Sequence, residues 1–237
     1  MAGAVELTGA GSRALKPGQL VPADADVRVL QRPRWASRAG AKLEAALDAF
    51  GVDPTGLACL DAGASTGGFT DVLLGRGARI VYAVDVGRAQ LIDRLRRDER
   101  VVSMERTNLR TLERLPEAVQ LATLDLSFIS LRLVLPTVRS LLAHDGQVVA
   151  LVKPQFEAGK GVVPRGGVVS DTIVHRDVLV EFGEAARATG FGARNLIRSP
   201  IAGGDGNLEF LAHLAAPPGI RPTDWEGLID AVSGTSG

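Results

Sequence analysis

Residues 60–70 read Leu-Asp-Ala-Gly-Ala-Ser-Thr-Gly-Gly-Phe-Thr and continue an apolar run that begins at Leu57. The apolar run predicts a buried parallel strand, and the glycines predict a sharp turn from that strand into a helix. Glycines at such a turn let the backbone pass close to a ligand and leave the amides at the helix start free to bind it. The stretch therefore predicts an α/β fold with a ligand site at the end of this strand.

The spacing of the glycines indicates which kind of ligand binds. It is D-x-G-x-x-x-G-G, which differs from the G-x-G-x-x-G of dinucleotide sites. The carboxylate of Asp61 is placed to accept hydrogen bonds from an amine, such as that in the amino-acid part of S-adenosylmethionine. We expect this methyl donor rather than another nucleotide, and a turn with only a packing role is the further alternative. The residues expected to bind the donor here are Asp61, Gly63, Ala64, Ser65, Thr66, Gly67, Gly68 and Phe69.

Strand-like and helix-like segments alternate from residue 38 to about residue 190. This alternation predicts a Rossmann-like, doubly wound and mostly parallel sheet, with ligands at the carboxyl ends of its strands. The last two strands flank a Gly/Asp turn and are expected to pair antiparallel. The seven expected strands are 57–61, 79–86, 101–105, 121–126, 147–152, 193–197 and 209–214, and the expected helices are 38–50, 68–76, 88–98, 131–143 and 171–189.

Polar residues stand where several of the expected strands end. Asp85 ends the second strand, where a carboxylate can bind the two ribose hydroxyls of an adenosine, with capping of the next helix as the alternative. Asn108 follows the third strand and either reads the adenine edge or serves the turn. Asp125 lies at the end of the fourth strand, and Lys153 follows the fifth. Because these strands lie beside the first strand in this topology, we expect both side chains to converge beside the methyl donor.

Lysine is rare in this chain. Only four lysines (Lys16, Lys42, Lys153 and Lys160) stand among 27 basic residues, so arginine is the ordinary cation. A lysine at a strand end is therefore a hint that a primary amine is needed, because lysine has a tunable pKa and arginine does not.

Six separate motifs occur in the order found in one known family: 37–43 (SRAGAKL), 61–70, 106–108 (RTN) after Asp85, 125–130 (DLSFIS), 152–157 (VKPQFE) and 207–210 (NLEF). By these motifs the chain resembles the TlyA, or haemolysin A-like, branch of the FtsJ-type rRNA 2′-O-methyltransferases. The resemblance implies a class I fold that uses S-adenosylmethionine to methylate the ribose of a cytidine in rRNA. It also implies a catalytic Lys-Asp-Lys-Glu tetrad, which falls on Lys42, Asp125, Lys153 and Glu209.

The chemistry gives each member of this tetrad a role. A ribose 2′-hydroxyl is a poor nucleophile, so a group must take its proton as it attacks the methyl group in line. Lys153 is the candidate base, and a neighbouring Lys42 ammonium would favour its neutral form, whereas Asp125 and Glu209 would oppose it. Alternatively, Lys153 stays charged and stabilises the developing alkoxide. Asp125 is expected to orient Lys153, and Glu209 to fix Lys42 and the ribose.

The flanks of the methyltransferase segment, residues 38–215, have a different character. Residues 1–31 form a short β-rich segment that resembles the back half of the family's RNA-binding domain, so either the true start lies upstream or the RNA is found another way. Residues 32–37 form a basic linker, and residues 216–237 form a tail with a possible short helix. The candidate RNA contacts are Arg32, Arg34, Trp35 and Arg38, which combine cations with an aromatic ring for stacking.

The composition indicates further what kind of protein this is and which partners to expect. The net charge is zero, so any RNA-binding surface must come from local clustering. Cys59 is the only cysteine, no run of about 18 apolar residues occurs, and no histidine has a partner at metal-ligand spacing. We therefore expect a cytoplasmic protein without a membrane span or a metal, with rRNA or a ribosomal subunit as partner. His175 is expected on a solvated helix face.

The sequence leaves three other functions to compare with this interpretation. A Rossmann dehydrogenase is disfavoured by the glycine spacing. A methyltransferase fold that acts on a different hydroxyl remains an alternative. A non-enzymatic haemolysin or cytolysin is suggested by the family name, although no long amphipathic or apolar segment supports it.

Overall fold

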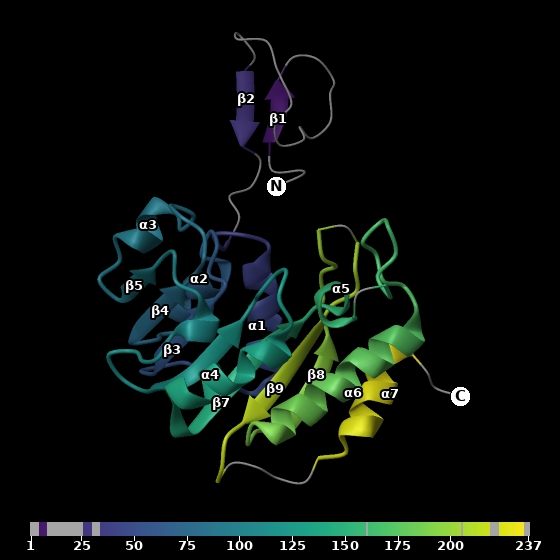
Figure 1. Cartoon of the computed structure of the whole chain (residues 1–237). Helices are drawn as coiled ribbons and strands as arrows, with labels where there is room; N and C mark the ends of the chain where they lie inside the picture. Colours follow the sequence, from purple (N-terminus) through teal and green to yellow (C-terminus); the bar gives the residue numbers. More distant parts are fainter. Residues whose placement is uncertain are drawn as a thin grey trace.

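The structure is a computed structural model that describes residues 5–8, 26–29, 34–159, 161–204, 206–218 and 223–234. Its main body is a seven-stranded sheet with helices on both faces (Figure 1). A separate two-stranded sheet pairs β1 (Val5–Thr8) with β2 (Asp26–Val29) in antiparallel fashion. The assignment of residues 1–31 to an RNA-binding domain stays a prediction.

The order of strands in the main sheet is β5-β4-β3-β6-β7-β9-β8. Strands β3 to β7 run parallel, and β9 is antiparallel to both of its neighbours, β7 and β8. The doubly wound, mostly parallel sheet and the antiparallel pairing of its last two strands are thus confirmed. The strands are β3 (Ala58–Ala62), β4 (Ile80–Val84), β5 (Val101–Met104), β6 (Val119–Leu124), β7 (Leu142–Val152), β8 (Gly192–Arg198) and β9 (Phe210–Ala215).

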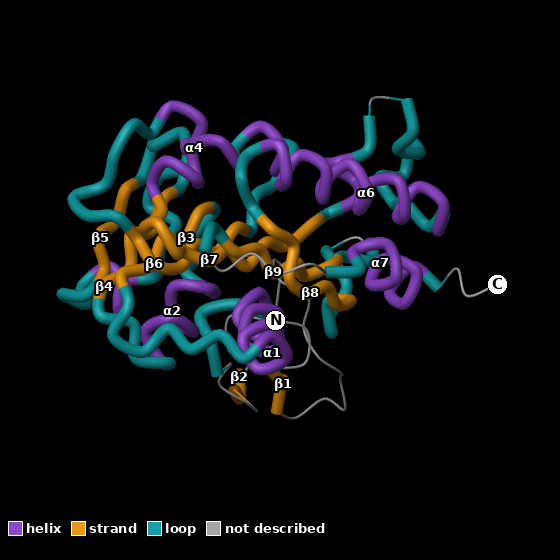
Figure 2. The backbone as a smooth tube through the Cα atoms, turned by 90° about the horizontal axis from the view of Figure 1, so that it is seen from below, coloured by secondary structure: helices purple, strands orange, loops and turns teal. Residues whose placement is uncertain are grey.

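Helices cover both faces of this sheet (Figure 2). On one face lie α4 (Leu135–Leu141) and α6 (Thr172–Ala188), and on the other lie α1 (Ala39–Phe50) and α2 (Gly68–Gly75). Each face has its own buried apolar cluster, and alternate residues of the buried strands enter one cluster or the other. The sheet is therefore sandwiched, and its strand ends are the places left open for a ligand.

Short elements complete the chain around this framework. α7 (Trp225–Ser233) packs against α6 and β8. The remaining elements are the helices α3 (Asp93–Arg96) and α5 (Pro154–Glu157) and the 3-10 turns η1 (Leu109–Thr111) and η2 (Leu131–Leu133).

Two of the expected helices differ from prediction. The expected helix 88–98 is reduced to α3, because Ala89 has a positive φ of 52° and its amide donates to the Glu105 carboxylate, which holds the chain in a turn. The expected helix 131–143 is divided into η2 and α4. Pro136, in the first turn of α4, has no amide to continue a helix that begins upstream.

The expectation for His175 was also wrong. This residue is 3% exposed, and its Nε2 lies 2.9 Å from the carbonyl oxygen of Val169. Its ring packs edge-on against Phe210. The loop before α6 covers a histidine that helical periodicity alone would leave in solvent.

Candidate active site

The loop between β3 and α2 is shaped by glycines at two close approaches. Gly63 has φ +86°, and a Cβ there would lie 2.3 Å from the carbonyl oxygen of Asp125. Gly67 has φ +97°, and a Cβ there would meet the side chains of Leu91 and Leu95. Glycine is therefore required at both positions by backbone conformation and by packing. The approach at Gly63 brings the end of β3 against the segment that follows β6.

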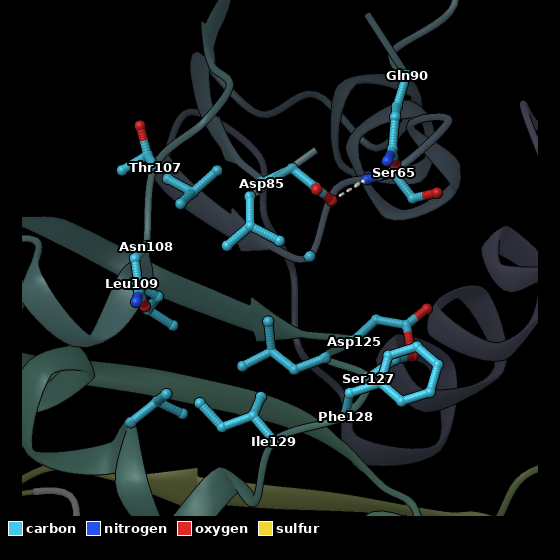
Figure 3. A pocket seen from close by; sticks show the side chains of 15 residues that line it. Ser65, Asp85, Gln90, Thr107, Asn108, Leu109, Asp125, Ser127, Phe128 and Ile129 are labelled. Atoms are coloured by element: carbon cyan, nitrogen blue, oxygen red, sulfur yellow. Dashed lines mark hydrogen bonds between the residues drawn. The ribbon is translucent and has the colours of Figure 1, made fainter. Parts of the chain in front are cut away.

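A cavity of about 460 Å³ opens at the carboxyl ends of the parallel strands (Figure 3). This volume falls in the range of small-molecule and cofactor sites. Of the residues predicted to bind the cofactor, Gly63, Ser65, Asp85, Asn108 and Asp125 line the cavity. Further lining residues that sequence reasoning did not assign are Val84, Val86, Gln90, Thr107, Leu109, Leu126, Ser127, Phe128, Ile129 and Val134.

Asp85 connects two loops at the rim of the cavity. One of its carboxylate oxygens accepts a hydrogen bond of 2.8 Å from the amide of Ser65, drawn in Figure 3, and the other accepts one of 2.6 Å from the amide of Gly87. Each carboxylate oxygen can accept two hydrogen bonds, so one acceptor position on each oxygen is left for a ligand. Asp85 thus caps the turn that follows β4 rather than the next helix, and its contact with a ribose stays a prediction.

Asn108 likewise caps a turn, and it also lines the cavity. Its side-chain oxygen accepts a hydrogen bond from the amide of Arg110 and so caps η1. It nevertheless lines the cavity, on the wall opposite Ser65 and Gln90 (Figure 3). Contact with adenine stays a prediction.

Asp61 lies away from the cavity lining. Its carboxylate is fully buried and accepts hydrogen bonds from the hydroxyls of Thr70 (2.6 Å) and Thr123 (3.3 Å). Burial raises the pKa of Asp61 to about 7, a shift that the Thr70 hydrogen bond opposes. Contact with the cofactor amine stays a prediction that this placement does not favour. The predicted residues Ala64, Thr66, Gly67, Gly68 and Phe69 likewise stand outside the cavity lining.

The four tetrad positions form two ion pairs. Lys153 Nζ lies 2.7 Å from the carboxylate of Asp125 and donates to the hydroxyl of Ser127 at 3.0 Å. Lys42, on α1, donates to the carboxylate of Glu209, just before β9. The two lysines and Glu209 are buried, and buried charges persist only when they are paired. The structure thus joins Lys153 to Asp125, as expected, and places Asp125 on the cavity wall as well.

Phe156 lies beside Lys153 and packs against Phe128. Sequence reasoning assigned no role to either aromatic side chain. Phe128 is 91% exposed with φ +64°, and its ring centroid lies 5.0 Å from that of Phe156. Lys153 Nζ is 5.8 Å from the centroid of the Phe156 ring. A bulky residue with positive φ is strained, and such strain gathers at functional sites. The signal available in the sequence was an aromatic residue just past a strand end.

The candidate RNA-binding residues are partly engaged within the protein. The indole N–H of Trp35 donates to Glu44 at 3.1 Å, and its ring packs beside Gly40 and Gly75. Arg34 pairs with Glu44 at 2.8 Å and stacks over Trp35 at 4.7 Å. RNA contact by Trp35 and Arg34 stays a prediction that this packing does not favour. Arg38 is exposed, and Arg32 lies outside the described residues.

The fold and the cavity define a class of protein. The structure of an S-adenosylmethionine-dependent methyltransferase from Mesorhizobium loti superposes with a TM-score of 0.55 at 17% identity, over 75% of this chain and 99% of that one. At this identity the likeness establishes the fold alone. The protein therefore has the Rossmann-like fold of methyltransferases.

Closer similarities define the family. The family model described as FtsJ-like methyltransferase matches residues 35–216. The 16S/23S rRNA (cytidine-2′-O)-methyltransferase TlyA of Mycobacterium tuberculosis (strain ATCC 25618 / H37Rv) is 44% identical over 241 residues, 97% of this chain and 89% of that protein. A Streptococcus thermophilus protein of known structure, provisionally named a hemolysin, has a TM-score of 0.83 and 42% identity over 97% of this chain and 86% of that one. The chain belongs to the FtsJ-like methyltransferase family.

Proposed function

We propose that this protein transfers the methyl group of S-adenosylmethionine to the 2′-hydroxyl of a cytidine in ribosomal RNA. The observation that carries the proposal is the position of Asp125, which lines the cavity and pairs with Lys153 at 2.7 Å. One residue therefore links a cofactor-sized cavity to a buried amine. Relatives named as rRNA cytidine-2′-O-methyltransferases support both the reaction and the substrate.

The residues that line the cavity fit S-adenosylmethionine. Asp85 offers acceptor positions for the ribose hydroxyls, and the apolar Val86, Leu109 and Ile129 suit the faces of an adenine ring. Gly63 and Asp125, at the other end of the lining, would hold the methionine part near Lys153. When bound, this cofactor supplies an electrophilic methyl group.

The Lys153 group is suited to handle the proton of the ribose hydroxyl. Asp125 and Ser127 accept hydrogen bonds from two of the three positions on the Lys153 nitrogen, so the third position is left to face the 2′-hydroxyl. Once Lys153 has given one proton to Asp125, its nitrogen would accept the proton of the 2′-hydroxyl as the 2′-oxygen bonds to the methyl carbon and the bond from that carbon to sulfur breaks, its electron pair staying on sulfur. Lys153 therefore ends in the charge state in which it began, and Asp125 ends protonated.

The aromatic pair beside Lys153 suits a nucleotide base. Single-stranded or flipped-out bases bind by stacking on aromatic rings. Phe128 is open to solvent and lies against Phe156, and Phe156 lies under Lys153. A cytosine stacked on Phe128 would bring its ribose toward the Lys153–Asp125 pair.

The decisive experiment is transfer of labelled methyl groups from S-adenosylmethionine to ribosomal subunits from a strain that lacks this gene. We expect label on the 2′-oxygen of a cytidine, located by ribose-methylation mapping of the rRNA. Label on another hydroxyl would replace the substrate assignment. Absence of transfer to either subunit would contradict the proposed function.

A further inference from the structure

The buried carboxylate of Glu157 joins two segments of the candidate active site. Glu157 ends α5, four residues after Lys153, and its side chain is 3% exposed. It accepts a hydrogen bond of 2.6 Å from the hydroxyl of Ser130 and one of 2.7 Å from the amide of Leu131. Both donors belong to the segment that leaves β6, so this single carboxylate ties the β6 segment to the β7 segment.

Arg132 adds to the same connection. Its Nη2 donates to the backbone carbonyl of Glu157 at 3.0 Å, and its Nε lies 3.7 Å from the Glu157 carboxylate. Arg132 also pairs with Glu181 on α6. Burial raises the pKa of Glu157, and the hydrogen bonds from Leu131 and Ser130 act against that rise. Burying a carboxylate costs desolvation energy, which the hydrogen bonds from Ser130 and Leu131 and the nearby Arg132 guanidinium offset.

Residues 125–131 lie beside residues 153–157, and the contacts of Glu157 join the two segments at one end. The other end is closed by Lys153, which contacts Asp125 and Ser127. Between the two ends, Phe128 adopts its strained positive φ and packs on Phe156. A strained residue persists only where the surroundings over-determine it, and the contacts at both ends do so here.

We propose that Glu157 is a positioning residue for methyl transfer, whose carboxylate holds the 125–131 segment in the register that aligns Asp125 and Ser127 with Lys153. This proposal rests on the proposed function. Glu157 is absent from the cavity lining, so it acts through the residues it positions and not through contact with the cofactor. A displacement of about 1 Å at a reacting group can cost about 100-fold in rate.

The test measures kcat for methyl transfer to ribosomal subunits, with both substrates saturating, in Glu157→Ala and Glu157→Gln. We expect kcat to fall about 100-fold in the alanine variant. The glutamine variant should retain more of the rate than the alanine variant, because its side-chain carbonyl can still accept the hydrogen bond from the amide of Leu131. The Kd for S-adenosylmethionine should change far less than kcat. Glu181→Ala is the matched control, since it removes the exposed partner of Arg132 and should keep the wild-type rate.

The outcomes separate this inference from the proposed function. A wild-type kcat in Glu157→Ala, beside an inactive Lys153→Ala, would overturn the positioning role and leave the methyltransferase function intact. An equal loss of rate in Glu181→Ala would also overturn it.

If Glu157→Ala does not fold, Ser130→Ala provides a second test. It removes one of the two hydrogen bonds to the Glu157 carboxylate, and we expect a several-fold lower kcat with a shifted kcat–pH profile. An unchanged rate and profile in Ser130→Ala would refute the inference. Absence of transfer by the wild-type protein would contradict both proposals.

Discussion

The two halves of the candidate site are held in place by different groups, backbone amides in one half and paired charged side chains in the other. On the β3–β5 side, the carboxylate of Asp85 is fixed by the backbone amides of Ser65 and Gly87 and lies at the rim of an open cavity. On the β6–β9 side, charged side chains are fixed by one another in the pairs Lys153–Asp125 and Lys42–Glu209, and all of them except Asp125 are buried. The first half is therefore suited to bind a ligand, and the second to hold charged groups in fixed positions.

Replacement of Lys153, in the second half, should give the largest loss of activity. We expect Lys153→Ala to lower kcat by about 10²–10⁴-fold, the usual contribution of a proton-transferring group, while the Kd for S-adenosylmethionine stays nearly unchanged. Calorimetric titration and single-turnover assays measure the two quantities separately.

Lys153→Arg sharpens the same prediction. Arginine keeps the charge but does not give up a proton, so we expect this variant to be as inactive as the alanine variant. A clearly active Lys153→Arg enzyme would contradict proton transfer through Lys153 and would favour a purely electrostatic role.

Variants of the Lys42–Glu209 pair test whether the pairing of buried charges also contributes to the free energy of unfolding. Lys42→Met leaves the Glu209 carboxylate buried without its cation, which should lower the free energy of unfolding by about 3–5 kcal/mol. The double variant Lys42→Met/Glu209→Leu should recover much of this loss, because no unpaired charge remains. Chemical denaturation measures both, and equal destabilisation in the single and double variants would disprove the explanation.

Asp61 is the exception on the binding side, because it is buried among hydroxyls. Its pKa is raised from 3.8 to about 7, so the folded state binds a proton more tightly than the unfolded state does. The stabilising contribution is complete below pH 3.8 and is lost as the pH rises through about 7. Asp61→Asn should remove this part of the pH dependence of unfolding. A variant with the wild-type pH dependence would show that Asp61 titrates normally.

Asp85 tests the binding half directly. Asp85→Ala removes the acceptor for two backbone amides and the acceptor proposed for the cofactor ribose. We therefore expect the Kd for S-adenosylmethionine to rise by about tenfold or more, or about 1.4 kcal/mol. The kcat at saturating cofactor should change little. A large fall in kcat with unchanged Kd would place Asp85 in the catalytic half instead.

Phe128 gives the smallest expected effect. Phe128→Ala should raise the KM for ribosomal subunits by about fivefold, or about 1 kcal/mol, which is the low end for stacking of one base. Phe128→Tyr is the control, because it keeps the aromatic face. An unchanged KM in the alanine variant would remove Phe128 from the binding of the RNA.

The sequence predicted backbone positions better than side-chain directions. Strand ends in a parallel sheet lie at one edge, so the approach of Asp125 and Lys153 followed from topology. The same reasoning could not foresee that Asp61 turns toward Thr70 and Thr123, since a strand position fixes a Cα but not its rotamer. Trp35 contacts Glu44 on the helix that follows it, and Glu157 contacts Ser130 on a different loop; helical or strand periodicity encodes neither pair.

The close approach at Gly63 has one further consequence. A hydrogen atom is the largest substituent that fits there, because a methyl carbon would lie 2.3 Å from the carbonyl oxygen of Asp125. Even Gly63→Ala would therefore force the β3–α2 loop away from Asp125, which pairs with Lys153. The enzyme could thus be silenced at a position that holds no functional group, and a genetic screen for loss of rRNA modification would recover such variants alongside those of the reacting side chains.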